Sequence, residues 1–150
     1  MKIALLGAGA WGTALAIAFA GKHDVTLWSR EADVAVDLQK TRENTRFFPG
    51  YKLPETVGVV TDFAAAVAGA ELLIVATPIA GLRPTAERLK EVGCTLPLLW
   101  VCKGFEAGSG KLPHQVVAEV LGMQAICGAL SGPSFAEEVA AGQPTAVALA

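Results

Sequence analysis

The feature that most constrains this chain is a regular alternation of short apolar runs with segments of helical pattern. The apolar runs are predicted strands, at residues 2–6, 24–28, 57–60, 71–76, 97–102, 125–130 and 145–150. The predicted helices are at residues 11–21, 31–42, 63–68, 79–92, 112–121 and 135–141. This alternation predicts right-handed βαβ units and an α/β fold with a doubly wound, mostly parallel sheet. Because ligands bind outside the carboxyl ends of such strands, the residues that follow each strand are the candidates for function.

The composition agrees with buried parallel strands, since 53% of the residues are hydrophobic. The formal net charge is -2, without blocks of like charge, which argues against a nucleic-acid partner. Cys94, Cys102 and Cys127 have neither disulfide nor metal spacing. We therefore expect a reduced, cytoplasmic protein without a metal site.

A secretory signal is the alternative for the N-terminus. Residues 3–21 carry no charge, follow Lys2 and contain Ala18-Phe19-Ala20, which matches the A-x-A pattern of a cleavage site. The glycines at positions 7, 9 and 12 oppose this alternative. Each would cost up to ~1 kcal/mol in the helical core of a signal. We expect no signal and no membrane insertion.

The first predicted strand leads into Gly7-Ala8-Gly9-Ala10-Trp11-Gly12, a G-x-G-x-x-G pattern. The first glycine of this pattern allows a tight turn, the second lets the backbone approach a pyrophosphate, and the third lets helix and strand pack closely. Free N–H groups and the positive end of the helix dipole then favour phosphates. The pattern lies between a strand and an alanine-rich helix. This context predicts a Rossmann-like dinucleotide-binding domain over residues 1–150.

The end of the second predicted strand bears on the choice of dinucleotide. An acidic residue there usually accepts a hydrogen bond from the ribose 2′-hydroxyl of NAD. This chain has Ser29-Arg30 instead, with Glu31 at the start of the next helix. An arginine fits a 2′-phosphate, so we expect NADP (as NADPH) to be preferred, with NAD as a possible cofactor. Alternatively, Arg30 is a solvated charge and Glu31 only complements the helix dipole.

Two further strand ends carry candidate residues. Thr77-Pro78 is either a wall beside the nicotinamide ribose or a simple junction between strand and helix. Lys103 follows the apolar run 98–101 and precedes Gly104, which allows a ligand to approach closely. A lysine at such a place can hold an anionic substrate or polarise a carbonyl group. The alternative is an exposed lysine at the end of a strand.

A second loop, residues 131–138, leaves the sixth predicted strand and opens the last helix. Its free N–H groups would form another corner that favours anions. Ser134 and Glu137 have the S-x-x-E spacing of a capping box. Capping alone would explain both residues, and it does not exclude contact between Ser134 and a ligand.

Several of these segments together carry a family resemblance. They are GAGAWGTALA, LWSRE, NTRFFPGYKLP, VATP, CKGFE and SGPSFAEEVAAGQPTA, and they cover the 150 residues in order. They resemble the bacterial NAD(P)-dependent sn-glycerol-3-phosphate dehydrogenases. The resemblance implies reversible reduction of dihydroxyacetone phosphate to sn-glycerol 3-phosphate for phospholipid synthesis. A homodimer is expected of the full-length enzyme.

The resemblance also implies roles for single residues. Lys103 would touch both cofactor and substrate, and Gly132 and Ser134 would touch the substrate. Phe47 stands where relatives commonly have tyrosine, and it either shields the cofactor or packs its loop down. The residues that the resemblance assigns to the dinucleotide by position are Gly9, Ala10, Trp11, Gly12, Arg30 and Ala136.

Relatives in this family have a helical second domain, which supplies a proton-transferring lysine and an arginine-asparagine site for the substrate phosphate. We expect that lysine beyond Ala150, and we expect these 150 residues alone to bind cofactor with little or no turnover. Two alternatives remain. One is the nucleotide domain of another two-domain hydroxy-acid reductase, of the 6-phosphogluconate or ketopantoate type. The other is a non-catalytic nucleotide-sensing domain.

Overall fold

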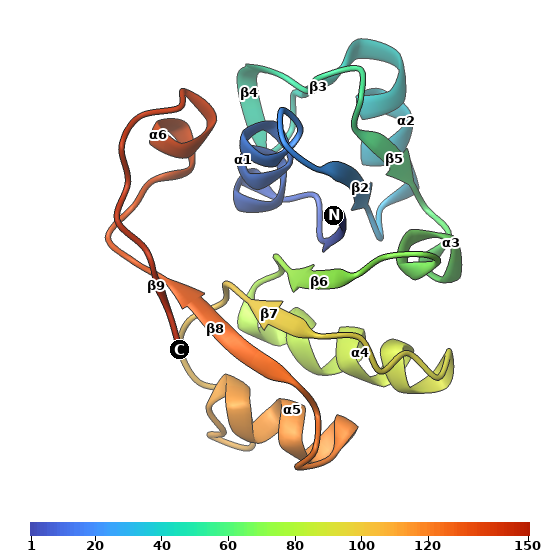
Figure 1. Ribbon diagram of the computed structural model, residues 1–150, viewed down its shortest axis with the longest axis vertical. Coiled ribbons are helices and arrows are strands. Elements are labelled where there is room, and N and C mark those ends of the chain that lie inside the picture. The colour runs from blue at the N-terminus through green and yellow to red at the C-terminus, as the bar shows by residue number, and fades with distance from the viewer.

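The computed structural model describes residues 1–150 as an α/β fold around one large sheet (Figure 1). Its strands are β1 (Lys2–Leu6), β2 (Asp24–Trp28), β5 (Gly58–Val60), β6 (Leu72–Val75), β7 (Leu98–Trp100), β8 (Cys127–Ser131) and β9 (Ala148–Leu149). Their order across the sheet is β5-β2-β1-β6-β7-β8-β9. Every neighbouring pair from β5 to β8 is parallel. The predicted doubly wound, mostly parallel sheet is confirmed.

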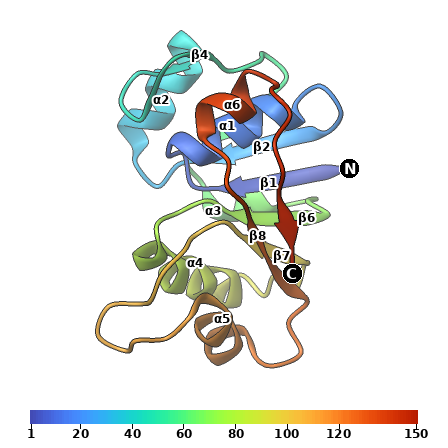
Figure 2. The same cartoon turned by 90° about the vertical axis from the view of Figure 1, so that its left-hand side faces the viewer.

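Helices cover both faces of the sheet, with α1 and α2 on one face and α4 and α5 on the other (Figure 2). The helices are α1 (Ala10–Phe19), α2 (Ala32–Thr41), α3 (Phe63–Val67), α4 (Ile79–Glu91), α5 (Pro113–Leu121) and α6 (Ala136–Ala140). Alternate side chains of β1 enter the two cores. Ile3 and Leu5 pack with α1 and α2, whereas Ala4 and Leu6 pack with α3, α4 and α5. Each fully buried leucine contributes about 1.5–3 kcal/mol of transfer free energy.

The course of the chain through the sheet reverses at β1. On one side of β1 lie β2 and β5, and on the other lie β6, β7 and β8. The connections that leave β1 and β6 therefore run to helices on opposite faces, which opens a crevice between these strand ends. Gly7 follows β1 directly, and Thr77 comes shortly after β6. Lys103 follows β7 on the same edge of the sheet, as predicted.

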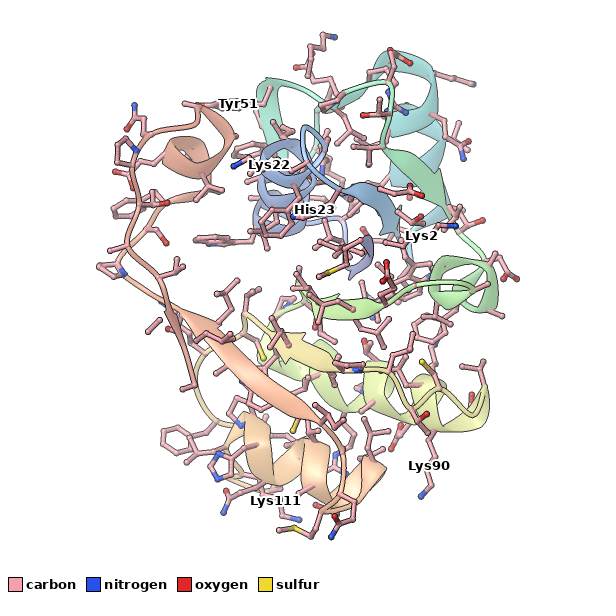
Figure 3. The ribbon with its side chains drawn as sticks, viewed as in Figure 1. Lys2, Lys22, His23, Tyr51, Lys90 and Lys111 are labelled. Atoms are coloured by element: carbon pink, nitrogen blue, oxygen red, sulfur yellow. The ribbon has the colours of Figure 1, made fainter.

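A second sheet occupies a segment that was expected to be a loop. There β3 (Glu43–Asn44) pairs antiparallel with β4 (Phe48–Lys52). Phe48 is buried against Ala14 of α1, and its ring stacks on Tyr51, which Figure 3 labels, with 4.5 Å between ring centroids. A proline and a glycine inside β4 hide the strand pattern in the sequence. Packing on α1 therefore decides the structure of this hairpin.

The last helix and the last strand also differ from prediction. β9 is short and antiparallel to β8. The predicted capping box of Ser134 and Glu137 is wrong by one residue: the Phe135 N–H donates to Glu138 Oε2 at 3.0 Å. The Ser134 hydroxyl does not cap this helix: it is buried and makes no hydrogen bond. At the start of α3, Asp62 is the N-cap, and its Oδ1 accepts a hydrogen bond from the Ala65 N–H at 2.6 Å.

The N-terminal segment lies at the centre of the fold. Residues 3–6 are all buried in β1, and α1 follows after the glycine turn. A secretory signal would instead have formed one continuous helix through this segment. No helix of the protein combines the length and the apolar character that crossing a bilayer requires.

Gly7 and Gly12 hold the start of α1 against the end of β1. Gly7 has φ +128°, and a Cβ there would lie 2.7 Å from the carbonyl oxygen of Ala76. A Cβ on Gly12 would lie 1.8 Å from the carbonyl oxygen of Gly7. Neither position accepts a side chain unless the backbone moves. The predicted structural roles of the first and third glycines are confirmed.

We expect Gly12→Ala to lower the free energy of unfolding by about 2 kcal/mol or more, because the added methyl group overpacks the contact with Gly7. Gly21→Ala is the matched control, since an added Cβ there meets no atom within 4 Å. Urea denaturation of both variants measures the difference. Equal free energies of unfolding for the two variants would contradict this, since α1 could then move away from β1 without loss of stability.

Candidate functional site

A crevice of about 520 Å³ opens at the carboxyl ends of β1, β2 and β6. Six residues predicted for the dinucleotide meet in its walls, namely Gly7, Gly9, Arg30, Phe47, Thr77 and Pro78. The other lining residues are Ala8, Trp28, Ser29, Glu31, Ala76, Ala80, Gly81, Pro84, Thr85 and Arg88. Residues that are far apart in the sequence are thus brought together around one crevice.

The glycine turn forms one wall of the crevice. Open space lies where a Cβ on Gly9 would stand, so a ligand phosphate can approach this backbone. The helix α1 begins at Ala10, and its first N–H groups and dipole favour an anion at this end. This wall therefore fits the pyrophosphate of a dinucleotide.

Beside the glycine turn, the end of β6 contributes an unpaired polar group. Thr77 Oγ1 is buried and has no hydrogen-bond partner. A buried hydroxyl left unpaired costs about 1–3 kcal/mol, so this group is a candidate partner for a ligand in the crevice. Gly81 of α4, which sequence reasoning missed, makes room for this side chain, since a Cβ there would lie 2.7 Å from Thr77 Cβ. A glycine inside a predicted helix was the available signal.

Two arginines flank one carboxylate where β2 leads into α2. Arg30, 69% exposed, lies 3.7 Å from Glu31, and Arg46 lies 3.9 Å from the same carboxylate. Arg46 also contacts Asp33 at 3.3 Å. Exposed pairs of this kind are worth ~1 kcal/mol or less, so they can rearrange around a ligand. The region offers an acceptor for a ribose hydroxyl and cations for a phosphate. The preference for NADPH stays a prediction, and sequence reasoning missed Arg46.

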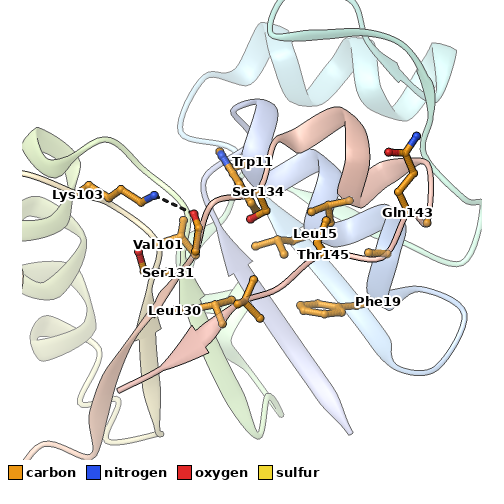
Figure 4. Close-up of a pocket in the computed structure, with 15 residues that line it drawn as sticks. Trp11, Leu15, Phe19, Val101, Lys103, Leu130, Ser131, Ser134, Gln143 and Thr145 are labelled. Carbon is orange, nitrogen blue, oxygen red and sulfur yellow. Dashed lines mark hydrogen bonds between the residues drawn. The ribbon is translucent and has the colours of Figure 1, made fainter.

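A second cavity, of about 330 Å³, lies between α1 and the ends of the antiparallel pair β8 and β9 (Figure 4). Lys103 Nζ donates a hydrogen bond to the carbonyl oxygen of Gly132 at 3.2 Å. Ser134 Oγ is buried here without a partner. The three residues predicted for the substrate therefore lie together. The cavity is lined by Trp11, Leu15, Ala18, Phe19, Val101, Lys103, Leu130, Ser131, Gly132, Ser134, Val139, Gly142, Gln143, Thr145 and Val147.

Some predicted dinucleotide residues lie outside the crevice. Trp11 lines the second cavity instead. Ala136 is buried against Ala14 and Phe48. Ala10 lies in the first turn of α1 and lines neither cavity. Contacts of these residues with a dinucleotide stay predictions.

An ionic network anchors the loop that follows Lys103. Arg83 of α4 donates to the two carboxylate oxygens of Glu106 at 2.7 and 2.9 Å. It also donates to Glu119 of α5 at 3.2 Å. The Arg83 guanidinium, helped by the Ser109 hydroxyl, lowers the pKa of Glu106 to about 2. Sequence reasoning missed this network, because partners 23 residues apart leave no local pattern.

Comparison with known proteins gives consistent matches. Residues 2–150 match the family model of the NAD-dependent glycerol-3-phosphate dehydrogenase N-terminus. The chain is 84% identical over 150 residues to the glycerol-3-phosphate dehydrogenase (NAD(P)+) of Dechloromonas aromatica (strain RCB), and 55% identical to that of Aromatoleum aromaticum. A crystal structure of glycerol-3-phosphate dehydrogenase from Coxiella burnetii superposes on 99% of the chain with a TM-score of 0.88 and 39% identity. All of this chain is matched in both curated relatives, and it spans 46% of the length of each of the three proteins.

We expect Glu106→Gln to change how stability depends on pH. The pKa of Glu106 is about 2 in the folded protein, below the ~4.3 of a free glutamate. The ionised carboxylate therefore stabilises the fold above about pH 4.3, and this contribution is lost as the pH falls toward 2. Chemical denaturation should show the wild type to be more stable than the variant at about pH 7, by a margin that shrinks below about pH 4.

Glu87→Gln, on the exposed side of the same helix as Arg83, is the control. Its difference in stability from the wild type should not show this change with pH. If the margin between wild type and Glu106→Gln were the same at neutral and acid pH, the ion pair with Arg83 would not hold the loop in solution.

Proposed function

Since this chain belongs to the NAD-dependent glycerol-3-phosphate dehydrogenase family, we propose that it is the dinucleotide-binding domain of an NAD(P)H-dependent enzyme. This enzyme reversibly reduces dihydroxyacetone phosphate to sn-glycerol 3-phosphate and supplies glycerophospholipid synthesis in the cytoplasm. The complete enzyme acts as a homodimer. The observation that carries the proposal is the crevice, whose lining includes both the open glycine turn and Thr77, whose hydroxyl is buried without a partner.

The second cavity supports the part of the proposal that concerns substrate. A nicotinamide would supply the hydride when bound, and the chain would have to hold the carbonyl group against it. Lys103 carries the positive charge that stabilises a developing alkoxide, and its flexible stem can leave the Gly132 carbonyl for the substrate. The Ser134 hydroxyl, buried and unpaired beside it, gives the substrate a second polar partner.

Membership of this family weighs against the alternative of a 6-phosphogluconate or ketopantoate type of reductase. The match runs through both the glycine turn and the region of Lys103, Gly132 and Ser134. A non-catalytic sensing domain would need the crevice but would make no use of Lys103. Turnover of the Lys103 variant therefore separates the enzyme from a sensor.

For cofactor choice, we expect Arg30→Ala to weaken NADPH binding by about tenfold and NADH binding by much less, because only NADPH carries the 2′-phosphate. Quenching of tryptophan fluorescence reports binding, since Trp28 lines the crevice. Lys40→Ala, an exposed basic residue of α2 outside the crevice, is the control and should change neither affinity. Tighter binding of NADH than of NADPH by the wild type would overturn this preference.

For catalysis, we expect Lys103→Ala in the full-length enzyme to lower kcat on the order of 100-fold, as removal of a charge-stabilising donor does. NADPH affinity should change far less. Lys90→Ala, an exposed lysine of α4, provides the control for loss of a surface charge. Turnover within a few-fold of the wild type would show that Lys103 has no catalytic role and is only an exposed lysine at the end of a strand.

A further inference from the structure

We propose that Asn44 is a positioning residue for the dinucleotide, because it holds the glycine turn and Phe47 in place from behind the crevice. This inference rests on the proposed cofactor function. Asn44 ends β3 and is 1% exposed, so it is a buried amide in a protein surface hairpin. It does not itself line the crevice.

Every polar group of the Asn44 side chain is engaged. Nδ2 donates to the carbonyl oxygen of Ala8 and to Thr13 Oγ1, both at 2.8 Å. Oδ1 accepts a hydrogen bond from the Phe47 N–H at 3.1 Å. These contacts fix the orientation of the amide, and they join β3, the glycine turn and α1 at one buried point.

The hydrogen bond to Ala8 sets the direction of the next N–H group. A trans peptide is planar, so its C=O and N–H point in opposite directions. When Asn44 holds the Ala8 carbonyl from behind, the Gly9 N–H of the same peptide must point away from Asn44. That N–H donates to no backbone carbonyl, and both residues line the crevice. The Gly9 N–H group is therefore oriented and free to donate a hydrogen bond to a ligand.

Thr13 extends this control to the following peptide. Thr13 is fully buried, and its Oγ1 donates to the carbonyl oxygen of Gly9 at 2.9 Å while it accepts from Asn44. The peptide between Gly9 and Ala10 is thus also held from its carbonyl side. Two consecutive peptides at the start of α1 are thus oriented before a ligand arrives, which removes the cost of ordering them on binding.

The third contact of Asn44 reaches another wall of the crevice. Its hold on the Phe47 N–H fixes the backbone at Phe47, a crevice residue that is 40% exposed. The Arg46 guanidinium lies 4.9 Å from the centre of the Phe47 ring. The buried Asn44 amide therefore fixes the position of the glycine turn relative to Phe47.

Asn44→Asp is the sharpest test, because it keeps the shape and Oδ1 but replaces both donated hydrogen bonds by an acceptor that repels the Ala8 carbonyl. We expect NADPH affinity to fall on the order of tenfold. Adenosine 2′-monophosphate has no pyrophosphate, so its weaker binding, followed by NMR line broadening, should stay within about twofold of the wild type. Leu89→Ala, in the core on the other face of the sheet, controls for lost stability and should leave NADPH affinity unchanged.

If Asn44→Asp does not fold, Thr13→Val replaces it, since valine keeps the shape and the backbone hydrogen bond to Gly9 but removes the hydroxyl that donates to Gly9 and accepts from Asn44. NADPH affinity equal to the wild type in the variant that folds overturns the inference. An equal loss of both ligands, or the same loss in Leu89→Ala, also overturns it, because Asn44 would then support the whole fold only. Failure of the wild type to bind NADPH would instead reject the proposed function itself.

Discussion

The close approach of α1 to the end of β1 is the contact on which the rest of this structure depends. It exists because Gly12 has no Cβ to meet the Gly7 carbonyl. The approach places the first turn of α1 at the edge of the sheet, where the crevice opens. The same helix then runs beside the second cavity, which Trp11 and Leu15 help to line. One backbone contact thus sets the distance between the two candidate binding spaces.

The polar groups of the two spaces follow a common arrangement. Each contains a buried hydroxyl without a partner, Thr77 in the crevice and Ser134 in the second cavity. Each also has an exposed cation at its rim, Arg30 and Lys103 respectively. A hydroxyl buried without a partner destabilises a protein, whereas an exposed cation costs little free energy. The arrangement is therefore consistent with a ligand that supplies hydroxyl and phosphate groups.

Much of this architecture could be predicted because its determinants are local. The glycine turn, the apolar strands and Lys103 at a strand end follow from spacing and from the period of buried residues. The β3–β4 hairpin could not be predicted, since Phe48 and Asn44 are fixed by contacts with α1 and the glycine turn. The pairing of Arg83 with Glu106 was equally hidden, because it joins a helix to a loop across the fold.

Errors at the end of the chain have the same physical origin. The sequence pattern of β9 indicates a strand but cannot tell its direction, and β9 pairs antiparallel with β8. Ser134 has the residue type and spacing of a helix cap, but its hydroxyl makes no hydrogen bond, its residue lines the second cavity, and Phe135 is the N-cap.

The most direct test of the account is the backbone amide spectrum of this chain during titration with NADPH. The account predicts that the resonances of Gly9, Ala10 and Arg30 shift most, because phosphates would bind at the free N–H groups of the turn and at the end of β2. Shifts confined to other parts of the protein, or no shifts at saturating NADPH, would contradict the assignment of the crevice to a dinucleotide.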